Sequence, residues 1–138
     1  MGAACAGAAD VEMGRRLFTG ELPLAGRVTG HTTDLPQQAS RCVNCHAAGT
    51  AVPSASASAS ASAGPSTQSF GPVLNADLLA KNRPRRGGPP SKYDAAALCK
   101  LLTTGIDPAY IIIPRNMPRY DASIAECNAL WAYLSQTR

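Results

Sequence analysis

The pentapeptide Cys42-Val43-Asn44-Cys45-His46 constrains this chain more than any other feature. Its two cysteines, separated by two residues, fit on one turn of helix, and the histidine follows directly. This spacing is typical of the covalent attachment of a c-type haem, in which both thiols add to the vinyl groups of the porphyrin. We therefore expect Cys42 and Cys45 to hold one haem c, and His46 to be an axial ligand of its iron.

A Cys-x-x-Cys pair also occurs in zinc half-sites and in redox dithiols. A zinc site needs a second pair of ligands, and His31 is the only other histidine in the chain. A thioredoxin-like dithiol belongs to a βαβ pattern, which the sequence does not show. A haem-free zinc or dithiol protein remains an alternative interpretation.

Composition agrees with a small cofactor-binding protein. The 138 residues fit one domain spanning 1–138, and only 5% of them are aromatic, so a bound apolar group would supply part of the core. No apolar run is long enough to span a membrane. The net charge of +4 is too small and too scattered to indicate nucleic-acid binding. It fits docking to an acidic protein partner, or an ordinary solvated surface.

The hydrophobic pattern predicts helices and no strand, so the expected fold class is all-α with long irregular loops. The first helix covers about residues 9–18 and ends at Gly20. Residues 21–40 show no sustained period and predict a loop. Ser40 or a neighbour is expected to open the short helix that carries the haem motif.

Capping signals predict two longer helices after the motif. Ser91 is expected to begin one of them, with Asp94 as its partner in a capping box and Gly105 at its end. Ser123 and Glu126 form a second capping box that opens the last helix. The residues of that helix expected to face inward are Ile124, Cys127, Trp131 and Leu134.

Two segments stand outside the helical pattern. Residues of about 53–66 repeat Ser-Ala and have no large side chain to bury, which predicts a flexible surface insertion. Cys5 follows Gly2-Ala3-Ala4, as at a lipoprotein processing site, so it is either a lipid anchor or a terminal thiol. Because haem is attached covalently outside the bacterial cytoplasm, we expect a periplasmic or extracytoplasmic location, although no signal peptide is visible in this sequence.

The second axial position of the iron decides what the haem does. A methionine there raises the reduction potential and, by filling the site, favours electron transfer. Met117 lies in the segment 113–120, whose prolines exclude a regular helix and favour a loop that can place a thioether against the iron. Met13 lies in the first predicted helix. His31 is the alternative ligand, and an open site is the third interpretation.

The order of these motifs resembles that of the class I c-type cytochromes. The matching residues beyond the haem motif are Gly71-Pro72, Met117-Pro118, Gly14 and Phe18 in the first helix, and Leu130 and Tyr133 in the last. The resemblance covers most of the chain apart from the Ser-Ala tract. It implies a helical domain wrapped around one covalent haem, with the first and last helices crossing closely at the glycine.

The resemblance also assigns residues around the haem. Pro72 would accompany a carbonyl that bonds the free ring nitrogen of His46, unless it is an ordinary turn proline. Tyr120 and Trp131 would wall the pocket, although core packing explains Trp131 equally well. Arginine suits the haem propionates because its planar fork binds carboxylates. The candidates, each of which has a solvated side chain as its alternative, are Arg85, Arg86, Arg115 and Arg119.

The function implied is that of an electron carrier and not an enzyme, with His46 and Met117 as axial ligands and a dehydrogenase or oxidase as redox partner. The alternative is a peroxidase-like haem enzyme or gas sensor with an open or displaceable sixth site, which needs a distal acid-base residue. Cys99 and Cys127 fall on inward helix faces near the pocket. In an oxidising compartment they would form a disulfide; two separate buried thiols are the alternative.

Overall fold

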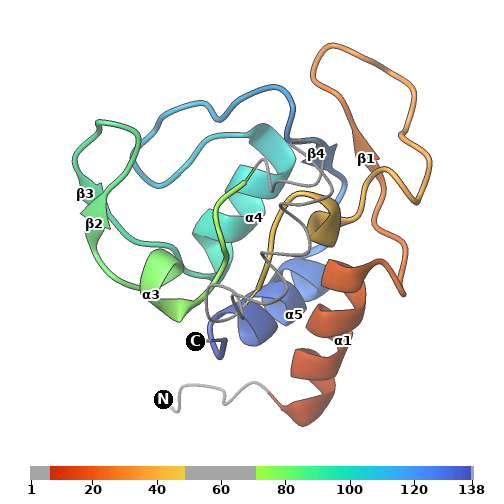
Figure 1. Cartoon of the computed structure of the whole chain (residues 1–138), viewed down its shortest axis with the longest axis horizontal. Coiled ribbons are helices and arrows are strands. Elements are labelled where there is room, and N and C mark those ends of the chain that lie inside the picture. Colours follow the sequence, from red (N-terminus) through yellow and green to blue (C-terminus); the bar gives the residue numbers. More distant parts are fainter. Residues whose placement is uncertain (1–6, 49–70, 138) are drawn as a thin grey trace, which may run out of the picture.

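The computed structural model describes residues 7–48 and 71–137 (Figure 1). In chain order they form α1 (Ala8–Thr19), β1 (Gly26–Arg27), a 3-10 helix (Cys42–Asn44), α3 (Ala76–Leu79), β2 (Arg83–Pro84), β3 (Pro90–Ser91), α4 (Ala95–Thr104), β4 (Arg119–Tyr120) and α5 (Ile124–Leu134). The Ser-Ala tract at about 53–66 and Cys5 lie outside the described residues. None of the described helices is long and apolar enough to cross a membrane.

The expectation of an all-α fold wrapped around a haem is wrong. The described residues also form two small antiparallel sheets, β1 with β4 and β2 with β3. The first sheet joins distant parts of the chain and pairs Arg27 with Arg119. Each strand has only two residues, too few to show the alternation that identifies a strand in a sequence. Pro84 and Pro90 in the second sheet also argue against strands when the sequence is read alone.

The helices α1 and α5 cross at close range (Figure 1). The rings of Phe18 and Tyr133 lie 5.7 Å apart at the crossing. Gly14 is buried there, and a Cβ on it would overlap the carbonyl oxygen of Ala129 and lie 2.8 Å from the Cβ of Tyr133. The missing side chain at Gly14 therefore lets the two backbones approach, as the resemblance implied.

A disulfide between Cys99 and Cys127 joins α4 to α5, as the sequence also predicted. The same two helices and α1 contribute most of a single buried core. Its largest aliphatic members on these helices are Leu17, Leu98, Leu101, Leu102, Leu130 and Leu134.

The helix ends follow from local capping, with two corrections. The predicted capping box of Ser123 and Glu126 begins α5. Asp94, and not Ser91, caps α4: its carboxylate accepts a backbone N–H of the first turn at 2.7 Å, while Ser91 pairs in β3. Ile124 is 77% exposed because the buried face of α5 begins one turn later, so the expectation that it faces inward is wrong.

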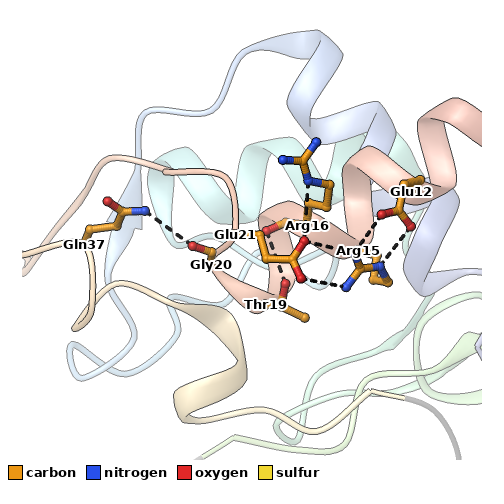
Figure 2. Close-up of polar contacts among 7 residues, drawn as sticks. All are labelled: Glu12, Arg15, Arg16, Thr19, Gly20, Glu21 and Gln37. Carbon is orange, nitrogen blue, oxygen red and sulfur yellow. Dashed lines mark hydrogen bonds and ion pairs between the residues drawn. The ribbon is translucent and has the colours of Figure 1, made fainter.

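Polar contacts attach the C-terminal end of α1 to the segment that leads to the Cys-x-x-Cys-His motif (Figure 2). Arg15 contacts Glu12 at 2.7 Å and Glu21 at 3.0 Å, and these hydrogen bonds lower the pKa of both carboxyls. The Gln37 side-chain amide donates to the Gly20 carbonyl at 3.4 Å. The Arg15 contacts stay within residues 12–21, whereas the Gln37 contact connects the end of α1 to the segment that leads to the motif; exposed contacts of this kind stabilise little individually.

Replacing Gly14 with alanine tests the helix crossing through the sign of the stability change. Helix propensity alone would stabilise the Gly14→Ala variant by about 1 kcal/mol. Because the added Cβ overlaps the backbone of α5, we expect instead a loss of about 2 kcal/mol in the free energy of unfolding, measured by denaturant titration. Ala9→Val, at an exposed position of the same helix, should cost only about 0.5 kcal/mol. A stabilised Gly14→Ala variant would contradict the close crossing.

Removing the Cys99–Cys127 disulfide tests the connection of α4 to α5. The two cysteines are 28 residues apart, so the double variant Cys99→Ala/Cys127→Ala should lose about 3.5 kcal/mol of stability through the larger entropy of its unfolded chain. Dithiothreitol should lower the Tm of the parent protein and leave that of the double variant unchanged. Equal sensitivity of both proteins to the reductant would mean that the disulfide is not formed.

Candidate functional site

The Cys-x-x-Cys-His motif forms a tight 3-10 turn, Cys42–Asn44, that gathers its side chains. The N–H groups of Cys45 and His46 both donate to the Cys42 carbonyl, at 3.1 and 2.9 Å. Arg41, the neighbour of Ser40, immediately precedes this turn, while the buried Ser40 hydroxyl donates to a backbone carbonyl. Neither cysteine is in a disulfide, and burial raises the pKa of the Cys42 thiol to about 11.

His46 is oriented by the backbone of the segment that begins at Gly71. Its Nδ1 lies 2.8 Å from the Pro72 carbonyl oxygen, and burial of the ring lowers the His46 pKa. An Nδ1–H donated to that carbonyl leaves the Nε2 lone pair as the coordinating position. Gly71 packs so closely against the ring that a Cβ there would overlap it. The Gly71 N–H in turn donates to the Cys45 carbonyl at 3.0 Å, which fixes this segment against the motif.

Met117 is half-buried in the loop that precedes β4. The guanidinium of Arg119 organises this loop by donating to the carbonyls of Met117, Ile113 and Pro114 at 2.8, 3.0 and 3.4 Å. Arg119 also packs on Gly105, where a side chain would overlap it. Arg119, a sequence candidate for binding propionates, therefore binds backbone carbonyls and positions the methionine loop.

His46 and Met117 face the same space. Two adjoining cavities of about 270 and 380 Å³ share six lining residues: Cys42, His46, Pro72, Arg86, Ile113 and Met117. The wall of the smaller cavity is mainly apolar and includes core residues of α1, α4 and α5 such as Phe18, Leu98 and Leu130. The site is therefore an apolar space bordered by one imidazole, one thioether and the Cys42 thiol.

The two adjacent arginine candidates have different surroundings. Arg85 donates to the carbonyls of Leu78, Leu79, Lys81 and Ser91, and its guanidinium lies 4.9 Å from the centre of the Tyr93 ring. Arg86 lines both cavities, has a 43% exposed side chain and lies 3.6 Å from an Asp107 carboxylate oxygen. Arg85 also lines the smaller cavity, but Arg86 is the one of the two that lines both.

Three further arginines differ in whether they line the two cavities. Arg115 is exposed and is not among the residues that line the two cavities. Arg83 lines the smaller cavity and Arg41 the larger one, and sequence reasoning missed both. The Nε of Arg41 is buried and has no hydrogen-bond partner among the described residues. Its position next to Cys42 was the signal that could have identified it.

The remaining candidates divide between the site and its surroundings. Tyr120 is buried, lines the larger cavity and donates its hydroxyl to the Ser40 carbonyl at 2.7 Å; burial raises its pKa. Trp131 is a half-buried core neighbour outside both linings. His31 is exposed and borders neither cavity. Within the described ranges, no three His, Cys, Asp or Glu side chains gather as a metal-ion cluster.

Asp107, which sequence reasoning did not single out, lies in the wall of the smaller cavity with a buried side chain. One carboxylate oxygen accepts the N–H groups of Ala109 and Ile111, both at 2.9 Å. The other oxygen has no hydrogen-bond partner among the described residues, and Arg86 lies at ion-pair distance from it. An Asp-Pro pair in a loop predicts an ordinary turn, so the sequence gives no sign that the Asp107 side chain is buried.

Comparison with known proteins returned no match to a protein-family model, to a curated protein or to a solved structure. The functional interpretation therefore depends on the residues of the site.

Substitutions at Gly71 and Pro72 separate two ways of orienting His46. Gly71→Ala should displace the imidazole because the new Cβ overlaps the ring. Pro72→Ala retains the main-chain carbonyl that contacts Nδ1, so His46 should stay in place. The measurement is the chemical shift of the His46 ring protons by NMR, with His31→Gln to assign the signals. A larger change in the Pro72 variant than in the Gly71 variant would contradict this geometry.

Proposed function

We propose that this protein is a one-electron carrier that holds a single haem c through thioethers to Cys42 and Cys45, with His46 and Met117 as axial ligands. The observation that carries the proposal is that His46 and Met117 both border the same two adjoining cavities, together with Cys42. The proposal agrees with the resemblance of the motifs to those of class I c-type cytochromes and makes no use of the helix content.

The donor set fits this cofactor. A haem iron takes one imidazole nitrogen and one thioether sulfur in carriers of this kind, and bound haem supplies reversible transfer of one electron. The Pro72 carbonyl holds Nδ1 of His46, which leaves Nε2 for the metal. The guanidinium of Arg119 holds the loop that carries Met117. Arg86, at the border of both cavities, is the arginine that we assign to a haem propionate.

Electron transfer is favoured over catalysis because both axial positions are assigned to protein side chains. A peroxidase-like reaction needs an open coordination position and an acid-base residue above it. His31, the histidine that would supply this group, is exposed and outside the linings of both cavities. Apolar side chains around the site keep water away, which limits reorganisation when the charge of the iron changes.

An extracytoplasmic location belongs to the same proposal. Covalent haem attachment takes place outside the cytoplasm in the proteins that the motif resembles. The Cys99–Cys127 disulfide agrees with an oxidising compartment, because disulfides persist there and are rare in the cytosol. The partner that we propose is a redox protein, a dehydrogenase or an oxidase.

Spectroscopy of the holoprotein, expressed with a haem-maturation system, tests the ligands. Met117→Ala should keep the covalent haem but lose the long-wavelength absorbance band of a methionine-ligated ferric iron and bind cyanide or carbon monoxide readily. Met13→Ala, a methionine of α1 that lines neither cavity, should leave the spectrum unchanged. An unchanged spectrum for Met117→Ala would exclude this ligand. Ready binding of carbon monoxide by the parent protein would favour the enzyme or sensor function.

The attachment itself is tested separately. Cys42→Ala/Cys45→Ala should abolish covalent haem, measured as the pyridine haemochrome of the denatured protein. Parent protein that contains no haem under these expression conditions would contradict the proposed function altogether and favour the zinc or dithiol alternative, which metal analysis and thiol titration then distinguish.

A further inference from the structure

A single acidic side chain lies among the described residues that line the two cavities of the candidate site. It belongs to Asp107, in the loop that follows α4, and it contributes to the wall of the smaller cavity. The side chain is only 1% exposed. Because an isolated charge is costly to bury, Asp107 is stable in this wall only through the groups that contact it.

Hydrogen-bond donors surround the Asp107 carboxylate. One oxygen accepts the N–H groups of Ala109 and Ile111, both at 2.9 Å. The Nε of Arg86 lies 3.6 Å from the other oxygen, which has no hydrogen-bond partner among the described residues. An ionised carboxylate only accepts hydrogen bonds, so these surroundings suit its charged form. The backbone of the loop thus holds a negative charge in the cavity wall.

Arg86 offsets this negative charge only in part. Its side chain is 43% exposed, so water screens the guanidinium more than it screens the buried carboxylate of Asp107. In the proposed function the same guanidinium also binds a haem propionate, so that one arginine serves two carboxylates. Arg83 and Arg85 line the smaller cavity as well, and both are more exposed than Asp107. Part of the Asp107 charge therefore remains effective inside the cavity.

The field of Asp107 acts on another residue of the same wall. Burial raises the pKa of Tyr93 to about 12, and the negative charge of Asp107 adds to this rise. Tyr93 lines the smaller cavity together with His46 and Met117. The carboxylate therefore influences the charge state of a group that borders the same space as the two proposed iron ligands.

We propose that Asp107 lowers the reduction potential of the proposed haem through its buried negative charge. An electron that enters the haem reduces the charge of the iron by one, and a fixed negative charge nearby opposes this change. The opposition is stronger where water is excluded, because the local dielectric constant is low. Burial and the groups around a haem are among the means by which proteins set its potential. This inference rests on the proposed function.

The variant that isolates the charge is Asp107→Asn. Asparagine retains an oxygen that can accept the N–H groups of Ala109 and Ile111, and it places an uncharged amide group next to Arg86. Spectroelectrochemical titration of the holoprotein at neutral pH should give a more positive midpoint potential than that of the parent. A potential equal to that of the parent, or more negative, would overturn the proposal.

Asp94→Asn is the matched control. The Asp94 carboxylate also accepts a backbone N–H, at 2.7 Å, but Asp94 is exposed and lines neither cavity. Asparagine caps a helix about as well as aspartate, so α4 should be retained, and water screens the charge that is removed. The midpoint potential should therefore stay close to that of the parent. Equal positive shifts in both variants would indicate an effect of net charge alone and would overturn the role of Asp107.

A second comparison tests the charge when Asp107→Asn alone yields no folded holoprotein. The double variant Arg86→Gln/Asp107→Asn replaces both members of the ion pair by neutral amides, so it leaves no buried charge without a partner. Its midpoint potential should be more positive than that of Arg86→Gln, and equal potentials would contradict the proposal. Thermal unfolding is recorded for every variant, and a lowered Tm with an unchanged potential would assign Asp107 a structural role only.

Haem content separates this inference from the proposed function. Parent protein without covalent haem, measured as the pyridine haemochrome, would contradict the proposed function itself. Fully loaded Asp107→Asn with the potential of the parent would contradict only the role of Asp107.

Discussion

The antiparallel pairing of β1 with β4 is the constraint on which the candidate site depends. It places Arg27 opposite Arg119, directly after the loop that carries Met117. The neighbouring hydroxyl of Tyr120 donates to the Ser40 carbonyl, just before the Cys-x-x-Cys-His motif. These contacts bring together parts of the chain that are far apart in sequence. Together with the Ile113 N–H, which donates to the Gly105 carbonyl at the end of α4 at 2.8 Å, they position the methionine loop relative to His46.

The elements predicted correctly from sequence are those that local chemistry determines. Glycines end α1 and α4 in the left-handed conformation, at Gly20 and Gly105, and the Ser123–Glu126 box begins α5. The pairing of β1 with β4 was missed because strands of two residues have no pattern of their own. The error between Ser91 and Asp94 has a related cause, since both residue types cap helices and tertiary pairing of Ser91 in β3 decides between them.

The contacts of the arginines could likewise not be predicted from the sequence. Sequence can identify Arg85, Arg86 and Arg119 as cations near the expected pocket, but it cannot identify which acceptors they reach. In the structure, Arg85 and Arg119 each bind several backbone carbonyls. The Leu78 and Leu79 carbonyls are at the C-terminal end of α3, where a helix leaves carbonyls without partners of its own, and the Arg119 acceptors lie in the loop before β4. The two guanidinium groups therefore supply donors that regular secondary structure does not supply there. A guanidinium bound in this way is a scaffold, and Arg86, which lines the cavities, is the one that remains for an external anion.

Core and site are not separate regions of this protein. Leu98, Leu101, Leu130 and Leu134 belong to the buried core and also line the smaller cavity. A cofactor in this space would cover apolar surface of the core residues themselves, so the proposed haem would also be part of the core. The disulfide and the α1–α5 crossing both hold together the helices whose side chains form this apolar wall.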